Sequence, residues 1–204
     1  MEHLNLFADN NNDFEPIKIR NGEYVYVPCF FDITESNNYF QKLTKEIDWK
    51  QEEINMYGRN VKLPRLTAWY GDNDKPYSFS GITLTPNPWT PELIEIKQAI
   101  ESKCIGVFNS VLLNLYRNGN DSISWHTDAE KELGNNPVIA SVNFGATRTF
   151  QLRHQTTKQK IDLKLKNGSL LIMQGELQHY WQHQVPKTSE DVGQRINLTF
   201  RIIK

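Results

Sequence analysis

The chain has 204 residues, of which 38% are hydrophobic and 23% charged, values near the globular average that predict one domain with one core. Its formal net charge of −1 excludes a general polyelectrolyte binder, so any contact with a nucleic acid must come from a local patch. No apolar run approaches the roughly 20 residues that cross a bilayer, the N-terminus lacks secretory features, and two cysteines support neither a disulfide framework nor a CxxC site. We expect a soluble intracellular monomer without membrane contact, cytoplasmic in a bacterium or nuclear in a eukaryote.

The N-terminal part of the chain is predicted to form a leader and a helix. Residues 1–15 are rich in Asn and Asp, which indicates a flexible leader before a single domain of residues 16–204. From Phe30 the pattern becomes helical and ends near Trp49, with Thr34 as the capping residue. Its apolar side chains recur at spacings of three to four residues: Phe40, Leu43 and Ile47.

A second helix is predicted to begin just after residue 90. Thr90 is a favourable N-cap, Pro91 suits the first helical position, and Glu92 lies near the positive end of the helix dipole. One apolar stripe follows, made of Leu93, Ile96, Ile100 and Cys104. We expect this stripe to pack on a β core.

After about residue 107 the pattern changes to strands. Short alternating or apolar runs are separated by Gly, Asn and Pro, a spacing that predicts a sandwich or barrel with two flanking helices. The sequence has no internal repeat, GxGxxG or P-loop, so nothing supports a nucleotide cofactor. The predicted strands are residues 108–116, 139–144, 149–153, 160–165, 169–173 and 195–203.

The most informative segment is the start of the last predicted strand, residues 195–201. Because side chains alternate across a strand, its polar residues share one face and its apolar residues the other. Taken alone, this pattern fits an ordinary half-exposed strand equally well. The polar face comprises Arg195, Asn197, Thr199 and Arg201, and the apolar face comprises Ile196, Leu198 and Phe200.

Two histidines and one aspartate have the pattern of a metal site. His126 and Asp128 lie two residues apart, so on a strand their side chains point the same way and can bind one metal together. Two neutral imidazoles and one carboxylate on one face of an octahedron are typical of non-haem Fe(II). The second imidazole is expected from a distant strand: His183, twelve residues before Arg195, is preferred, and His179 is the alternative.

The open positions on such an iron would take a bidentate 2-oxo acid and dioxygen. The remote carboxylate of a dicarboxylate co-substrate is best met by a planar guanidinium inside a barrel, which Arg195 or Arg201 supplies. Asn114 and Tyr116, again two residues apart on the strand before His126, can add neutral hydrogen bonds to the same ligand. These features together favour a metal-dependent enzyme over a chance pattern.

Five short segments share their residues with a known family. They are Asn114-Leu115-Tyr116, His126-Thr127-Asp128, residues 140–145 (ASVNFG), Trp181-Gln182-His183 and residues 195–201 (RINLTFR). Through these segments the sequence resembles the AlkB-like iron(II)/2-oxoglutarate DNA-repair dioxygenases over about residues 25–204.

The resemblance implies a mostly β fold with flanking helices (α+β), a double-stranded β-helix or jelly roll. The catalytic core would occupy about residues 107–204, and an N-terminal nucleotide-recognition lid about residues 50–90. His126, Asp128 and His183 would hold Fe(II). The pocket for 2-oxoglutarate would comprise Asn114, Tyr116, Arg195, Thr199 and Arg201.

The implied activity is oxidative demethylation of alkylated bases, typically 1-methyladenine and 3-methylcytosine, in single- or double-stranded DNA. Dioxygen and 2-oxoglutarate would be converted to succinate and carbon dioxide, and the methyl group would leave as formaldehyde. A base in a duplex must first leave the stack, and methylation that already blocks pairing lowers this cost.

Residues that grip the base are expected mainly in the lid. By resemblance, Phe79 would stack on the flipped base, with Tyr77 and Ser80 near its edge. The same aromatic residues also fit a packed hairpin without any ligand. Related sequences often have two acids after the metal-binding aspartate, but this chain has Ala129 followed by Glu130. Glu130 alone is therefore available there to accept a hydrogen bond from the exocyclic amine.

Contacts to the nucleic-acid backbone are expected from the segment before residue 66. Tyr57 is a candidate wedge for the gap left by an extruded base. Arg59, Lys62 and Arg65 form a small basic cluster for phosphates. Residues 188–190 (TSE) stand where double-strand-acting relatives place a basic triplet, so single strands are a serious option as substrate.

Two other functions fit the same residues. One keeps the iron and the co-substrate but acts on methylated RNA or tRNA. The other is a jelly-roll binding module without metal, in which HxD and the arginines recognise a ligand. His183 and the pair of Arg195 and Arg201 speak against this module, because it has no need for both features.

Overall fold

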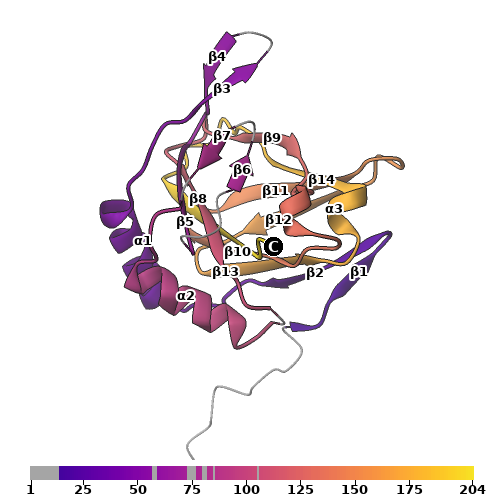
Figure 1. Ribbon diagram of the computed structural model, residues 1–204, viewed down its shortest axis with the longest axis horizontal. Helices are drawn as coiled ribbons and strands as arrows, with labels where there is room; N and C mark the ends of the chain where they lie inside the picture. The colour runs from indigo at the N-terminus through magenta and orange to yellow at the C-terminus, as the bar shows by residue number, and fades with distance from the viewer. Residues whose placement is uncertain (1–13, 57–58, 73–76, 80–81, 85, 105) are drawn as a thin grey trace, which may run out of the picture.

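The computed structural model of the protein describes residues 14–204 except 57–58, 73–76, 80–81, 85 and 105 (Figure 1). For residues 55–56, 59, 77–79 and 82–84 it describes the backbone alone. The predicted leader therefore lies outside the described residues except for its last two positions.

The larger of the two main sheets contains seven strands in the described part of the chain, each antiparallel to its neighbours. In spatial order they are β1 (Ile17–Ile19), β2 (Gly22–Val27), β13 (Ser169–Gln174), β10 (Ile139–Gly145), β15 (Arg195–Arg201), β8 (Ser110–Tyr116) and β5 (Leu66–Gly71). Every residue of β8 and β15 is buried. The segment 195–201 is therefore covered on both faces, and the half-exposed reading of it is wrong.

The smaller sheet has four antiparallel strands among the described residues and packs against one face of the larger sheet. Its order is β12 (Lys160–Leu165), β11 (Arg148–His154), β14 (Trp181–Val185) and β9 (Ile123–His126). The predicted mostly β fold with flanking helices, a jelly roll, is confirmed.

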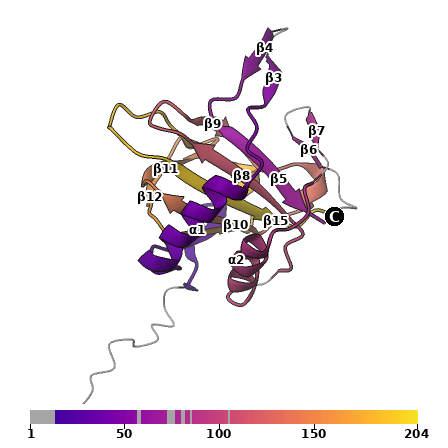
Figure 2. The same cartoon turned by 90° about the vertical axis from the view of Figure 1, so that its left-hand side faces the viewer.

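Two hairpins occupy the region in which the lid is expected. They are β3 (Glu53–Met56) with β4 (Arg59–Lys62), and β6 (Tyr77–Phe79) with β7 (Ile82–Leu84). The β3–β4 hairpin projects beyond the sheets in both views (Figures 1 and 2). Between the two hairpins, β5 pairs with β8, so this part of the segment belongs to the larger sheet.

Side-chain alternation divides the central strands into an apolar face and a polar face. On β15, Ile196, Leu198 and Phe200 are fully buried in the core that the helices cover. The alternate residues Arg195 and Arg201 line a cavity between the sheets. Because successive side chains of a strand point to opposite faces, the register that buries the apolar residues in the core also directs the polar residues into the cavity.

Helix α1 (Ile33–Glu46) is capped by Asp32 rather than by Thr34 as predicted. Asp32 Oδ1 accepts from the Glu35 N–H at 2.8 Å, and Glu35 Oε2 accepts from the Asp32 N–H at 3.0 Å. This reciprocal capping box satisfies two N–H groups, whereas Thr34 has no acidic residue three positions further on. The helix ends at Glu46, with Ile47 as its C-cap.

Helix α2 (Pro91–Glu101) has the predicted start. The Leu93 N–H donates to Thr90 Oγ1 at 3.3 Å, and Leu93, Ile96 and Ile100 are fully buried. The helix ends at Glu101, so Cys104 packs against the core from beyond the helix and not on its stripe.

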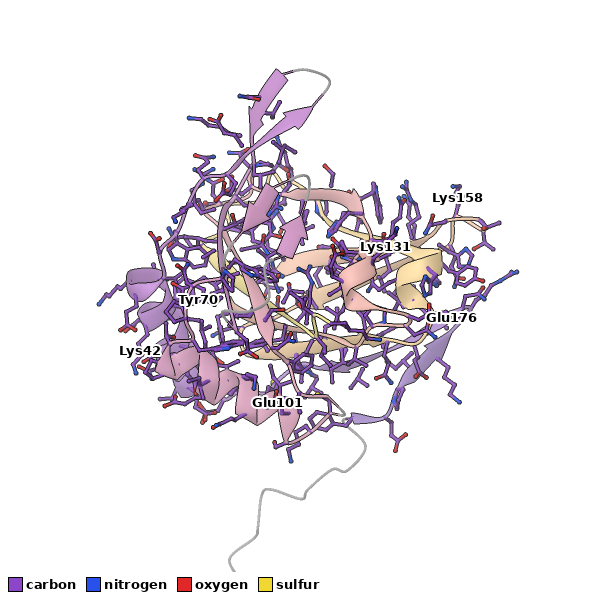
Figure 3. All side chains as sticks on the ribbon, viewed as in Figure 1. Lys42, Tyr70, Glu101, Lys131, Lys158 and Glu176 are labelled. Atoms are coloured by element: carbon purple, nitrogen blue, oxygen red, sulfur yellow. The ribbon has the colours of Figure 1, made fainter. Side chains whose placement is uncertain are left out.

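The two long helices lie side by side on the outer face of the larger sheet (Figures 1 and 2). The Nζ of Lys42 on α1, labelled in Figure 3, lies 3.0 Å from Glu92 Oε1 on α2. None of the helices in the described part of the chain combines the length and the apolarity needed to cross a membrane.

We expect Ile96→Ala to lower the free energy of unfolding by about 2–5 kcal/mol, because Ile96 is 0% exposed and the substitution leaves a cavity beneath α2. The matched control is Ile94→Ala on the same helix, where the side chain is 39% exposed and the change should stay near 0.5 kcal/mol or less. Urea unfolding measures both. Similar losses in the two variants would contradict the packing of this helix face.

Candidate metal centre and adjoining cavity

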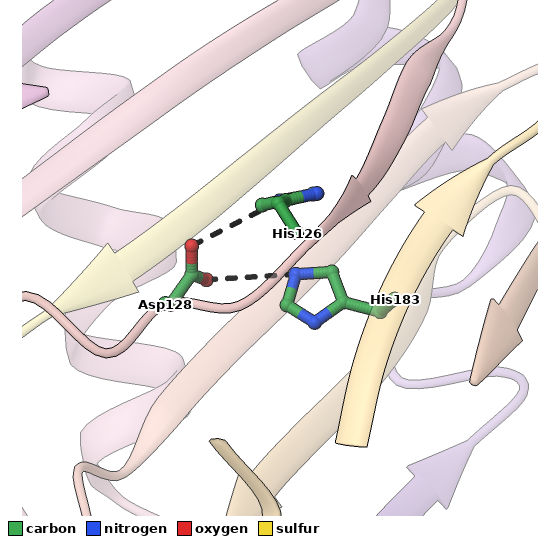
Figure 4. Close-up of side chains that lie close together, drawn as sticks. All are labelled: His126, Asp128 and His183. Atoms are coloured by element: carbon green, nitrogen blue, oxygen red, sulfur yellow. Dashed lines mark ion pairs between the residues drawn. The ribbon is translucent and has the colours of Figure 1, made fainter. Parts of the chain in front are cut away.

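His126, Asp128 and His183 converge at the β9 edge of the smaller sheet (Figure 4). His126 on β9 is directly opposite His183 on β14 in the antiparallel register. Asp128 Oδ1 lies 3.9 Å from His126 Nε2, and Asp128 Oδ2 lies 3.8 Å from His183 Nε2. One ligand atom from each residue falls within 4.8 Å of the other two.

The other histidine considered from the sequence is not in this group. His179 is exposed, and its Nε2 lies 3.0 Å from Asn136 Oδ1. The strand placement of Asp128 was also wrong, because β9 ends at His126 and Asp128 lies two residues further on. The aspartate thus reaches the histidines from an irregular segment.

Asp128 is buried beside a guanidinium. Its side chain is almost fully covered, and Arg201 Nη2 donates to Asp128 Oδ1 at 2.8 Å. Burial alone would raise the pKa of Asp128, but the charge of Arg201, with His183 and His126, outweighs burial and holds the pKa well below its usual range. Asp128 is therefore a carboxylate at neutral pH.

His183 is in the form that binds a metal, and His126 presents its Nε2 toward the carboxylate. Burial, and then the neighbouring His126, lowers the pKa of His183 to about 3, against the opposing effect of Asp128. His183 is therefore neutral at pH 7. His126 Nδ1 lies 2.8 Å from the Ser124 carbonyl oxygen, which can only accept, so Nδ1 carries a proton and Nε2 is the ring nitrogen that faces Asp128.

The three residues fit a non-haem iron(II) site. Two neutral imidazoles and one carboxylate form the donor set that such sites use, and the Nε2 atoms of both histidines face the carboxylate. Asp128 and His183 are each 3% exposed, which limits competition from water.

A cavity of about 310 Å³ opens beside the triad, a size that suits a small organic ligand. It is bounded by the inner faces of both sheets and by Ile54 and Val61 of the β3–β4 hairpin. All of the residues predicted for the co-substrate pocket line it, namely Asn114, Tyr116, Arg195, Thr199 and Arg201.

Arg195 is a buried cation without an acidic partner among the described residues. It is 1% exposed, and its Nη2 donates to Asn143 Oδ1 at 2.5 Å while its guanidinium lies 5.0 Å from the centre of the Tyr116 ring. Its Nε and Nη1 have no hydrogen-bond partner in the described part of the chain. Burial lowers the pKa of Arg195, although it remains a cation at neutral pH. An anionic ligand in the cavity would satisfy this charge.

Arg65, predicted as part of a small basic cluster for phosphates, is buried. It is 3% exposed, and its Nε donates to Asn114 Oδ1 at 2.7 Å while Nη1 donates to the Ser122 carbonyl at 3.4 Å. It lines the cavity between the sheets rather than the outer surface. Glu130 lines the same cavity, and its Oε2 is buried without a partner in the described part of the chain.

The remaining predicted substrate contacts cannot be placed by their side chains. Tyr57 and Ser80 lie outside the described residues. Arg59 begins β4, and Tyr77 and Phe79 are the first and last residues of β6, for which only the backbone is described.

A polar network on β10 was not predicted from the sequence. Ser141 and Asn143 face the polar side of β15, where Asn197 Nδ2 donates to Ser141 Oγ at 2.8 Å and Thr199 Oγ1 donates to Asn197 Oδ1 at 3.1 Å. Asn143 in turn accepts from Arg195. The alternation of Ser141 and Asn143 with apolar neighbours was the available signal.

Comparison with known proteins places the chain in a family. A model described as the 2OG-Fe(II) oxygenase superfamily matches residues 23–201. Alpha-ketoglutarate-dependent dioxygenase alkB homolog 3 of Bos taurus is 44% identical over 186 residues, which cover 86% of this chain and 64% of that protein. DNA oxidative demethylase ALKBH2 of Homo sapiens is 38% identical over 184 residues, covering 85% of this chain and 70% of that protein. The chain belongs to the AlkB-like 2OG-Fe(II) oxygenases.

Two further comparisons concern chain length and fold. This chain spans less than two thirds of the length of its bovine relative. A solved structure of OsALKBH1 matches it with a TM-score of 0.60 at 20% identity, covering 91% of this chain and 100% of that one. At this identity the match shows a shared fold.

For this AlkB-like chain, we expect Arg201→Met to lower the free energy of unfolding of the metal-free protein by about 3–5 kcal/mol, because Asp128 loses a buried charged partner. Added Mn(II) should recover part of the loss, since a cation compensates the carboxylate. Lys42→Met removes a solvent-screened partner of Glu92 and should have a far smaller effect. Urea unfolding with and without Mn(II) decides the question, and equal losses in both variants would contradict a buried pair.

Proposed function

We propose that this protein is an iron(II)- and 2-oxoglutarate-dependent dioxygenase that demethylates alkylated bases in DNA. One observation supports it above all. His126, Asp128 and His183 meet beside a cavity in which Arg195 is a buried cation without an acidic partner among the described residues. A binding module without metal would not require this combination.

Iron(II) would be held by His126 Nε2, His183 Nε2 and the Asp128 carboxylate. When bound, the iron supplies the oxidation chemistry in which dioxygen and 2-oxoglutarate become succinate and carbon dioxide and a substrate carbon is hydroxylated. The protein provides the Asp128 carboxylate and the neutral His183 imidazole, both almost fully buried. Oxidation of a methyl group attached to nitrogen yields a hemiaminal, which releases formaldehyde and restores the base.

The co-substrate would lie along the polar face of β15 and β8. Arg195 would pair with the carboxylate remote from the metal, because its Nε and Nη1 donors are available and Asn143 holds the other end of the guanidinium. Asn114, Tyr116 and Thr199 would add neutral hydrogen bonds. Arg201, which pairs with Asp128, would place a second positive charge near the metal-binding end of the co-substrate.

The substrate would be a base turned out of its stack, such as 1-methyladenine or 3-methylcytosine. The buried Oε2 of Glu130, which has no partner among the described residues, would accept from the exocyclic amine. Phe79 would stack on the base with Tyr77 and Ser80 at its edge, while Tyr57 and Arg59 would contact the strand. The name of the relative DNA oxidative demethylase ALKBH2 supports the choice of DNA.

We expect Asp128→Ala to abolish succinate and formaldehyde production, because one of the three metal donors is removed. The matched control is His179→Ala, which removes a nearby exposed imidazole outside the triad and should leave turnover intact. Mass spectrometry of methylated oligonucleotides, in DNA and RNA and as single and double strands, measures products directly. Turnover by purified Asp128→Ala would contradict the metal site, and a preference for RNA would change the substrate class.

We expect Arg195→Met to weaken 2-oxoglutarate binding by about 3–5 kcal/mol, since a buried carboxylate would lose its charge partner. Arg20→Met, at an exposed position, is the control and should bind normally. Titration of the Mn(II)-loaded protein with 2-oxoglutarate measures both affinities. Normal binding by Arg195→Met would place the co-substrate elsewhere.

A further inference from the structure

Asp128 is a ligand candidate whose backbone is not held by a sheet. Strand β9 ends at His126, so the Asp128 N–H is outside the ladder that fixes His126 opposite His183. The residue is nevertheless almost fully buried, where an unsatisfied N–H is costly. A group outside the sheet must therefore fix this part of the chain.

That group is the side chain of Gln178. Its Oε1 accepts from the Asp128 N–H at 2.9 Å, although the two residues are 50 positions apart. Gln178 is 1% exposed, and its Nε2 points to Met173 Sδ at 3.7 Å. Because a backbone N–H can only donate, the carboxamide must present its oxygen to Asp128, and its orientation is defined.

The helix that carries Gln178 is anchored from several directions. It is the short helix α3 (Leu177–Tyr180), which follows Glu176 (labelled in Figure 3). Leu177 is fully buried in the core between the sheets. At the helix end, Gln155 Nε2 donates to the His179 carbonyl at 2.9 Å, and the Gln155 N–H donates to the Tyr180 carbonyl at 2.8 Å. The position of the Gln178 backbone is therefore fixed by the contacts of α3.

We propose that Gln178 is a positioning residue for the metal centre. Its carboxamide holds the Asp128 backbone while Arg201 holds the carboxylate, so that Asp128 is fixed at both ends relative to His126 and His183. The inference rests on the proposed function, because it assumes that these three residues bind a metal. Groups that hold a metal ligand in place in this way typically contribute 10- to 100-fold to metal affinity.

The test uses Gln178→Met, which keeps a side chain of similar length but removes the acceptor. Anaerobic titration of the metal-free full chain with Co(II), followed by visible absorption, gives both the affinity and the spectrum that reports the ligand geometry. We expect binding about 10- to 100-fold weaker than in the wild-type protein and a shifted Co(II) spectrum. If Gln178→Met does not fold, Gln178→Asn, whose amide is one methylene too short, is used with the same expectation.

The control is His179→Ala on the same helix, which should leave the Co(II) affinity and spectrum unchanged. A variant of Gln178 that is folded, less stable to heat, and normal in Co(II) affinity and spectrum would overturn the inference, because the residue would then be merely structural. In that outcome the proposed function stands. A wild-type chain that binds no Co(II) would overturn both. A wild-type chain that binds Co(II) but, when loaded with iron(II), demethylates no base would overturn the function alone.

Discussion

The site depends on strands that are buried on both faces. In β15, alternate side chains point either into the hydrophobic core that the helices cover or into the cavity between the sheets. The first is filled by Ile196, Leu198 and Phe200, so the polar residues between them must enter the second. β8 and β10 pair with β15 and follow the same rule, which is why amides, hydroxyls and guanidinium groups gather in one cavity. A shift of one residue in register would exchange the core with the site.

The charge inside this cavity is unbalanced in a way that suits an anionic ligand. The guanidinium groups of Arg65, Arg195 and Arg201 line it, whereas Asp128 and Glu130 are the acidic residues among its described lining. Arg201 is engaged with Asp128, but Arg195 contacts a neutral amide and an aromatic ring. Buried guanidinium groups are stable where an anion completes their hydrogen bonding. A dicarboxylate and a divalent metal carry opposite charges, so together they would leave the net charge of this lining unchanged while giving Arg195 an anionic partner and Asp128 a second cation.

Capping residues and hydrophobic periodicity predicted the helices well, whereas burial that depends on distant segments was predicted less well. Thr90, Pro91 and the apolar stripe defined α2, because capping and periodicity act within one or two turns. The cap of α1 was misplaced by two residues, since Thr34 and Asp32 are both good caps and the reciprocal pairing with Glu35 decides between them. Arg65 was read as a surface cation because charge alone does not reveal burial. In the structure it hydrogen-bonds to Asn114 inside the cavity.

The residue types of the site and their alternation can be read along the chain: the HxD pair, a later histidine, and arginines and amides at alternate positions of strands. Which of these residues meet depends on how the sheets pair and pack. The pairing of β9 with β14 sets His183 opposite His126 and leaves His179 on the surface. The packing of α3 brings Gln178 to Asp128. Alternation and capping are properties of neighbouring residues and can be read along the chain. Contacts between segments 50 or more positions apart depend on the register of whole sheets, which no short pattern encodes.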